Sequence, residues 1–292
     1  MRRCEVVEQP TGFRLHDHVL WPHAGADDWR SVVVPFLQEG LTVNQRLVYA
    51  GTLQAEELLA DLAGLPDLDS LLASRRLALW SAQAEPGGLA RSVASEQVAR
   101  LDALVSAARA DGYAGVRLAS EVTGAVSDPD DAAAHLRLEC LVDGVAAARE
   151  LVVMCGIDRL VVRPVTMQAE LAVHPVRAAA GEMPWLHAVG VDTWSLVGQV
   201  DMVSRAGFAQ AVTALPEVMC GDVLHLHVDR LDFIDVAGMR ALVGLAEAVS
   251  DHGRVVLHHA PDWFVRALVL SFGSVDGLEL VRQERRRLRT LR

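Results

Sequence analysis

The chain has 292 residues, of which 51% are hydrophobic and 22% charged, and its formal net charge is −11. This length suggests two domains with well-filled cores, and the acidic balance argues against direct DNA binding. No apolar run approaches the ~20 residues of a membrane span, and no apolar run follows the first arginines as in a secretory signal. Four cysteines lie far apart without a Cys-x-x-Cys pair, so we expect a cytoplasmic location and no structural zinc.

The first half of the chain alternates predicted strands with predicted helices. Residues 1–14 are polar and contain Pro10 and Gly12, so we expect a poorly ordered lead-in. Apolar patterning then predicts strands at 18–21, 46–50, 77–80, 115–119 and 151–155, and helices at 29–40, 54–62, 92–111 and 132–149. This alternation indicates an α/β domain with a mainly parallel sheet.

A domain boundary is expected at residues 176–184, where small residues run into Gly181 and Pro184, and the next strand is expected near Leu186. Beyond it we predict strands at 223–228 and 254–258, and helices at 204–215, 239–249 and 261–272. Six arginines lie between Arg282 and Arg292. We expect residues 286–292 to form a solvated basic tail, with docking on an acidic surface as the alternative.

The second half is organised around residues 231–242, where a predicted strand runs through a short turn into a helix. Asp235 stands where the helix begins, so its carboxylate is expected to accept a hydrogen bond from an otherwise unpaired backbone amide. Ala237 and Gly238 leave the first turn bare, which lets another protein's backbone or a phosphate approach closely. An ordinary strand-to-helix turn with a capping aspartate explains the same residues.

This run resembles the signature of STAS domains, the anti-sigma-factor antagonist fold: an apolar strand, then Asp, a small residue, Ser or Thr, Gly and an apolar helix. Gly198-Gln199-Val200-Asp201 is similar to the family's Gly-Glu-Leu-Asp segment, and the resemblance covers residues 185–285. It implies a protein partner, an anti-sigma factor or a serine-kinase-type regulator. The implied partner-binding residues are Asp201, Asp235, Val236, Ala237, Gly238 and Met239.

Alanine stands where STAS domains carry their phosphorylated Ser. Ala237 has no hydroxyl, and neither has Val236 before it. The usual switch, in which an added charge of about −2 disrupts docking, is therefore not expected at this position. We expect regulation to come from the fused N-terminal domain instead.

The first half resembles the MEDS domain, a family of proposed sensory modules, some of them tied to sensing hydrocarbon derivatives. The resemblance implies a fold related to RecA-like nucleotide-binding domains over residues 15–180. The whole chain is then an α/β protein, with a RecA-like, mainly parallel sheet domain followed by a smaller α/β STAS domain. The matching segments are His16-Asp17-His18-Val19-Leu20-Trp21, Val34-Pro35-Phe36-Leu37-Gln38-Glu39-Gly40-Leu41, Asp111-Gly112-Tyr113-Ala114-Gly115-Val116-Arg117, Glu139, Cys155-Gly156-Ile157-Asp158 and His174-Pro175.

A small ligand, if the first domain binds one, is expected at the carboxyl edge of its sheet, where open α/β sheets form crevices. The residues expected there end or follow predicted strands. An Arg–Glu structural pair is the simpler explanation for Arg117, Glu121 and Glu139. The ligand-binding candidates are Trp21, Arg117, Glu121, Glu139 and Cys155.

Nucleotide chemistry is not expected. The loop at residues 22–28, where a RecA-like fold holds phosphate, has one glycine, no lysine, no Ser or Thr before the helix, and the carboxylates Asp27 and Asp28. No catalytic motif of a hydrolase or dehydrogenase is present, so we expect a non-enzymatic signalling regulator that needs no cofactor. A homo-oligomer is compatible with the sequence.

Two alternatives remain open. One is a degenerate RecA-like protein that still binds nucleotide. The other is a metal-dependent hydrolase that uses His16, His18 and His23, since imidazole is the commonest protein metal ligand. Strand alternation puts His16 and His18 on one face, but no Cys or carboxylate stands at motif spacing, so structural histidines without a bound metal are expected. His225, His227, His258 and His259 are expected to be solvent-facing or packing residues.

Overall fold

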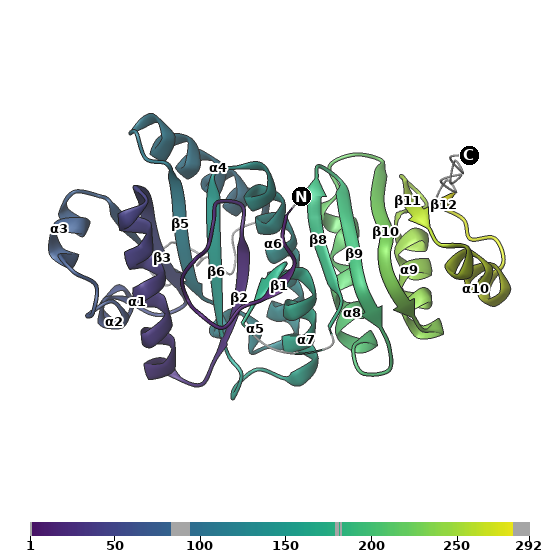
Figure 1. Ribbon diagram of the computed structural model, residues 1–292, viewed down its shortest axis with the longest axis horizontal. Helices are drawn as coiled ribbons and strands as arrows, with labels where there is room; N and C mark the ends of the chain where they lie inside the picture. The colour runs from purple at the N-terminus through teal and green to yellow at the C-terminus, as the bar shows by residue number, and fades with distance from the viewer. Residues whose placement is uncertain (1, 83–93, 179–180, 182, 283–292) are drawn as a thin grey trace, which may run out of the picture.

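Two β-sheets lie side by side in the protein, with helices between them and around them (Figure 1). The computed structural model describes residues 2–82, 94–178, 181 and 183–282. The expected basic tail at 286–292 lies outside the described residues. We refer to residues 5–177 as the N-terminal unit and to residues 185–282 as the C-terminal unit.

The N-terminal unit contains a seven-stranded sheet in the order β1-β7-β2-β6-β5-β3-β4, with all neighbours parallel. Parallel strands need crossover connections, and the helices supply them. The strands are β1 (Glu5–Val6), β2 (His18–His23), β3 (Gln45–Gly51), β4 (Leu77–Ser81), β5 (Gly115–Glu121), β6 (Leu151–Asp158) and β7 (Val176–Arg177). The helices are α1 (Ala26–Thr42), α2 (Ala55–Asp61), α3 (Leu68–Ala73), α4 (Ala94–Ala110), α5 (Thr123–Val126), α6 (Pro129–Ala148) and α7 (Pro164–Val173).

Two apolar layers cover the faces of this sheet, as expected of buried parallel strands. On one face, α1, α2 and α3 pack on strand residues such as Val19 and Val152. On the other face, α4, α5 and α6 pack on residues of opposite parity, such as Leu20 and Val153. The predicted α/β domain with a mainly parallel sheet is confirmed.

The C-terminal unit contains a five-stranded mixed sheet in the order β12-β11-β10-β9-β8, in which only the β8–β9 pair is antiparallel. Its strands are β8 (Trp185–Gly190), β9 (Thr193–Val200), β10 (Val223–Ile234), β11 (Arg254–Ala260) and β12 (Leu278–Arg282). Its helices are α8 (Arg205–Thr213), the 3-10 helix η2 (Leu215–Val218), α9 (Val236–Val249) and α10 (Asp262–Phe272).

Helices α6 and α7 of the N-terminal unit contribute to the hydrophobic core of the C-terminal unit. Helix α6 packs Val142 and Ala146 against the first sheet but turns Leu136 and Cys140 toward the C-terminal unit. Helix α7 contributes Ala169, Ala172 and Val173 to that same second core, and in Figure 1 both helices lie between the sheets. A continuous apolar interface of this kind resists relative motion of the two units.

The N-terminal segment differs from the expected lead-in. Glu5–Val6 forms strand β1 and pairs with Val176–Arg177, which forms β7 inside the expected boundary region. Arg3 is ion-paired with Asp17, and Arg2 donates to the carbonyl of Ala188 in β8. These two-residue strands have no local pattern of their own, because pairing between distant segments creates them.

The close approach of α7 and α8 yields a prediction. At Gly207 in α8, an added Cβ would lie 2.8 Å from the carbonyl carbon of Gln168 and 2.9 Å from the backbone nitrogen of Ala169. We expect Gly207→Ala to lower the free energy of unfolding by about 1–3 kcal/mol, because backbone atoms must move apart. The matched control is Gly244→Ala in α9, where nothing lies within 4 Å of the added atom.

Chemical denaturation of both variants checks this packing. Gly244→Ala is expected to be neutral or stabilising by up to about 1 kcal/mol, the helix-propensity gain. Equal stability changes in the two variants would contradict the close packing of α7 on α8.

Candidate functional site

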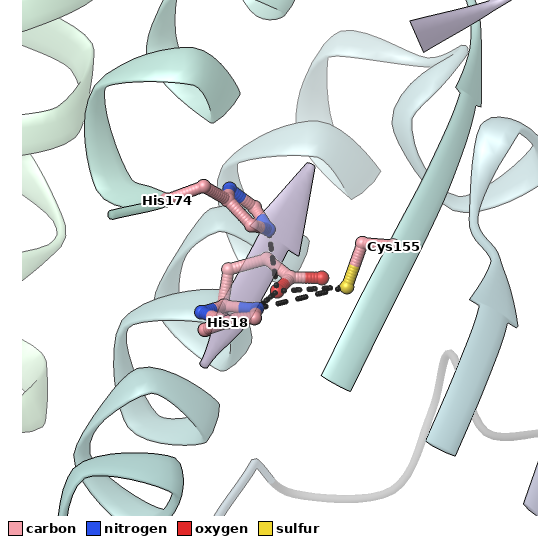
Figure 2. A group of neighbouring side chains, drawn as sticks. His18, Cys155 and His174 are labelled. Atoms are coloured by element: carbon pink, nitrogen blue, oxygen red, sulfur yellow. Dashed lines mark hydrogen bonds and ion pairs between the residues drawn. The ribbon is translucent and has the colours of Figure 1, made fainter. Parts of the chain in front are cut away.

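Polar side chains converge deep between the first sheet and helices α6 and α7. Figure 2 shows His18 from β2, Cys155 from β6 and His174, which follows α7, pointing toward one another. Glu139 of α6 lies among them and contacts all three. All four residues are at most 3% exposed, so the cluster is closed off from bulk solvent. We call these four residues the buried cluster.

The donor atoms of the buried cluster lie close together. The Nε2 atom of His18 lies 3.0 Å from Glu139 Oε2, and His174 Nε2 lies 3.4 Å from the same oxygen. The Cys155 Sγ atom lies 3.5 Å from Glu139 Oε2 and 3.7 Å from His18 Nε2. One atom from each of the four residues therefore faces a common point, with all four within 4.8 Å of one another.

Asp143 joins the buried cluster to the C-terminal unit. Its carboxylate lies 3.2 Å from His18 Nδ1 and accepts a hydrogen bond of 2.7 Å from the backbone amide of Ala188 in β8. Arg2 forms an ion pair of 2.7 Å with the same carboxylate. Asp143 is fully buried and contacts residues of both units.

A second layer of ionisable groups surrounds Glu139. His135, one turn earlier in α6, lies 2.7 Å from Glu139 Oε1. Glu170 of α7 is buried nearby, and neither of its carboxylate oxygens has a hydrogen-bond partner among the described residues. Glu170 lines a cleft of about 90 Å³ between α6, α7 and α8.

The pKa values follow from this burial and pairing. Burial alone lowers the pKa of His18, but its bonds to Asp143 and Glu139 outweigh burial and the pKa lies above its ordinary value. Burial raises the pKa of Glu139, yet the charge of His135 and the neighbouring histidines hold it well below its usual range. Burial raises the pKa of Glu170 to about 8 against the opposing charge of His135. Burial also raises the pKa of the Cys155 thiol well above normal.

The five residues expected to bind a ligand are divided between the two faces of the sheet. Glu139 and Cys155 lie in the buried cluster, whereas Trp21 packs against the opposite core, with α1. Glu121 ends β5 and contacts His23 and Thr123 at the carboxyl edge. The five do not form one pocket, because strand alternation sends neighbouring residues to opposite faces.

Arg117 is the clearest correction. It is fully buried on the α1 side, where it pairs with Glu39 at 2.8 Å and donates to Gln45 at 2.7 Å, so it does not meet Glu139. It lies in the middle of β5 rather than at its end. An Arg–Glu structural pair does form, but with a different glutamate.

The three histidines of the hydrolase alternative do not converge. His16 has a positive φ of 78° outside β2, and its Nδ1 lies 3.0 Å from the carbonyl oxygen of Ala146. His18 is in the buried cluster, and His23 pairs with Glu121 at the carboxyl edge. The expectation that His16 and His18 share one strand face is wrong, because the strand begins only at His18.

In the loop at residues 22–28, which is not expected to bind phosphate, a carboxylate of the protein itself binds a backbone amide. Asp28 accepts a hydrogen bond of 2.8 Å from the backbone amide of Ala24. Phosphate loops use such amides to hold the nucleotide, so in this chain at least one of them is already satisfied by an anion of the protein.

The turn before α9 forms as expected at Asp235, which caps the helix by accepting a 2.7 Å hydrogen bond from the amide of Gly238. Val236 and Ala237 are exposed, Asp201 is half-buried, and Asp235 forms an ion pair of 3.6 Å with Arg205. Gly238 and Met239 differ from the expected face, since both are buried and Met239 belongs to the core. Only the outer side of the first turn is available to a partner.

A comparison with known protein families assigns the first half of the chain to a family. Residues 17–175, more than half of the sequence, match the model of the family described as MEDS, the methanogen/methylotroph, DcmR sensory domain. The chain belongs to the MEDS family. No curated protein matches the chain. The family match indicates a signalling role, and no helix in the described part of the chain is long and apolar enough to cross a membrane.

The MEDS match covers the whole buried cluster, from His18 to His174. Sequence reasoning selected Glu139 and Cys155 from this cluster but treated His18 as a structural histidine and did not select His174, His135, Asp143 or Glu170. The polar residues in α6 at 135, 139 and 143 are spaced one helical turn apart, which is a detectable stripe. His174 has no such signal, because only the packing of α7 on the sheet brings it to the cluster.

Proposed function

We propose that the chain is a cytoplasmic signalling regulator without catalytic activity, in which the MEDS part senses a small ligand and the C-terminal unit binds a regulatory protein. The proposed partner is an anti-sigma factor or a serine-kinase-type regulator, as the STAS-like motif implies. The observation that carries the proposal is the direct bond between the two parts, from the buried carboxylate of Asp143 to the amide of Ala188. The buried cluster, which we propose as the sensory site, therefore borders the unit that carries the partner-binding motif.

An exposed apolar patch supports protein binding at the C-terminal unit. The backbone amide of Asp235 donates to the carbonyl of Val200 at 2.9 Å, so the ends of β9 and β10 lie together. Each end exposes apolar side chains that a solvated surface does not need: Met202 is 76% exposed, Val203 60%, Val236 54% and Phe233 47%. We infer that this patch, with Asp201, Asp235 and Ala237, is the partner face.

The coupling between the units runs through packed helices. Helix α7, which ends at the buried cluster, packs on α8, and Arg205 at the start of α8 is paired with Asp235 on the partner face. A shift of α7 by a bound ligand would therefore move the turn that holds Val236 and Ala237. Because Ala237 lacks a hydroxyl, this route replaces phosphorylation as the proposed means of control.

A charge at the partner face tests the proposal. We expect Ala237→Asp to weaken partner binding by several kcal/mol, because the new carboxylate and Asp235 place two like charges at one desolvated contact. The fold should be unaffected, since Ala237 is exposed and an acidic residue in a first turn stabilises a helix by ~0.3–1 kcal/mol.

The wild-type full chain, Ala237→Asp and the control Ala248→Asp are each used to capture proteins from the native cell. The control adds the same charge at an exposed position near the other end of α9. The proposal expects an anti-sigma-factor-class or kinase-class regulator that is retained by wild type and control and lost with Ala237→Asp. Its affinity is then measured by titration with each purified variant. Equal affinity for all three would show that this turn is not the interface.

A further inference from the structure

We propose that the buried cluster is a binding site for one divalent transition-metal ion of the zinc class, with Nε2 of His18, a carboxylate oxygen of Glu139, Sγ of Cys155 and Nε2 of His174 as the four ligands. The site is independent of the proposed partner face, because metal binding is measurable without any partner. The inference differs from the expectation of a metal-free protein, which rested on the lack of ligands at motif spacing.

The spacing of the donor atoms suits a tetrahedral ion. Zinc bonds of about 2.0–2.3 Å at tetrahedral angles put neighbouring ligand atoms roughly 3.3–3.8 Å apart. Four of the six distances between the donors are 3.0, 3.4, 3.5 and 3.7 Å, and none of the six exceeds 4.8 Å. Small side-chain adjustments are enough for all four to bind one ion.

Hydrogen bonds to the Nδ1 atoms orient both imidazoles for metal binding. The Nδ1 atom of His174 lies 2.6 Å from the carbonyl oxygen of Glu170, so it carries the proton and leaves Nε2 with its lone pair facing the cluster. His18 Nδ1 faces the Asp143 carboxylate in the same way. Metal-bound histidines almost always donate their other nitrogen to a carboxylate or a backbone carbonyl.

An unsatisfied atom points to a missing partner. The Nε2 atom of His174 is fully buried and has no hydrogen bond among the described residues, although Glu139 is its neighbour. Buried polar atoms are normally satisfied, and coordination of a metal ion is one recognised reason for an exception. A cation at the centre of the four donors would satisfy this nitrogen and neutralise Glu139 and a Cys155 thiolate.

The donor set selects the class of ion. Two imidazoles and a thiolate favour zinc or iron(II) over calcium and magnesium, which prefer oxygen ligands. Four protein ligands leave no position for a water molecule, as in closed, non-hydrolytic zinc sites. The site therefore agrees with a sensory or structural role and not with the hydrolase alternative.

The experiment uses the purified full chain, stripped with a chelator and then dialysed against Zn²⁺ or Co²⁺. We expect one metal ion per chain by elemental analysis and a thiolate-to-cobalt charge-transfer band in the Co²⁺ form. Cys155→Ser should abolish that band and weaken Zn²⁺ binding by more than about 100-fold, because loss of an outer-shell partner alone costs about 10–100-fold. Asp143→Asn should weaken Zn²⁺ binding by about 10–100-fold, because Asp143 contacts the ligand His18 and is not itself a ligand.

Cys140→Ser is the matched control, since Cys140 is equally buried and follows Glu139 in α6 but belongs to no donor group among the described residues. It should bind metal as the wild type does. X-ray absorption of the wild-type zinc form, which does not depend on variant folding, should show two nitrogen ligands, one oxygen and one sulfur at about 2.3 Å. Absence of stoichiometric metal, or zinc without a sulfur ligand, would overturn the proposal.

Discussion

Replacing Glu139 with alanine is expected to lower the free energy of unfolding of the metal-free protein by about 3–5 kcal/mol, the usual cost of removing one partner from a buried ion pair. Glu139 contacts His18 at 3.0 Å and His135 at 2.7 Å, and the pKa of His135 lies near 9 because the charge of Glu139 outweighs the effect of burial. Without the carboxylate, His135 must either stay charged and unpaired or give up its proton, and His18 loses one of its two carboxylate partners while Asp143 remains.

The matched control for this variant is Glu150→Ala. Among the described residues, the side chain of Glu150 forms a long, exposed ion pair of 3.9 Å with Arg109, so its removal should change stability by no more than about 0.5 kcal/mol. Denaturant titration of both variants in the presence of a chelator separates the carboxylate's electrostatic role from metal binding. A loss below about 1 kcal/mol for Glu139→Ala would mean that the buried imidazoles are neutral and need no counter-ion.

Arg117→Ala is expected to destabilise the protein by a similar amount, about 3–5 kcal/mol. The guanidinium of Arg117 donates to Gln45, to Glu39 and to the carbonyl oxygens of Phe36 and Phe13, and lies 4.7 Å from the centre of the Phe36 ring. Truncation removes a fully buried side chain. It leaves the buried acceptors on Gln45, Phe36 and Phe13 without this donor, whereas Glu39 is partly exposed.

Arg46→Ala on the neighbouring strand provides the comparison. Arg46 is partly exposed, and its ion pair with Asp111 spans 3.5 Å, so we expect a loss of about 1 kcal/mol or less. Thermal unfolding should therefore rank wild type and Arg46→Ala well above Arg117→Ala. Metal binding should survive in Arg117→Ala wherever the protein folds, because Arg117 lies on the opposite face of the sheet from the buried cluster. Equal melting temperatures for the two arginine variants would contradict the structural role assigned to Arg117.

Local sequence patterns predicted most helices and strands well. They predicted less well which distant residues meet in the folded chain. The apolar stripe of α1 and the alternation in β10 are visible in the sequence because each depends only on neighbouring residues. Asp235 was identifiable as a cap for the same reason. Strands β1 and β7 were not predicted, because two residues carry no pattern and their structure depends on each other.

The buried cluster shows why the site was only partly predictable. Its four ligand candidates come from β2, α6, β6 and the end of α7, so no spacing rule connects them. The pairing of His18 with Val153 and of Leu20 with Cys155 sets their relative heights in the sheet. Strand parity would have placed Cys155 and Arg117 on opposite faces, since they lie on neighbouring strands and Cys155 pairs with Ser120. The identification of Arg117 as a ligand-site candidate omitted that step.

In the proposed mechanism, the buried cluster communicates with the partner face through α7 and α8. Hydrogen exchange of the purified full chain, followed by mass spectrometry with and without saturating Zn²⁺, tests it most directly. We expect slower exchange at the Ala188 amide, which is bonded to Asp143, and altered exchange in α8 and in residues 235–239 at the start of α9. Stoichiometric metal binding with every exchange change confined to residues 5–177 would contradict this coupling.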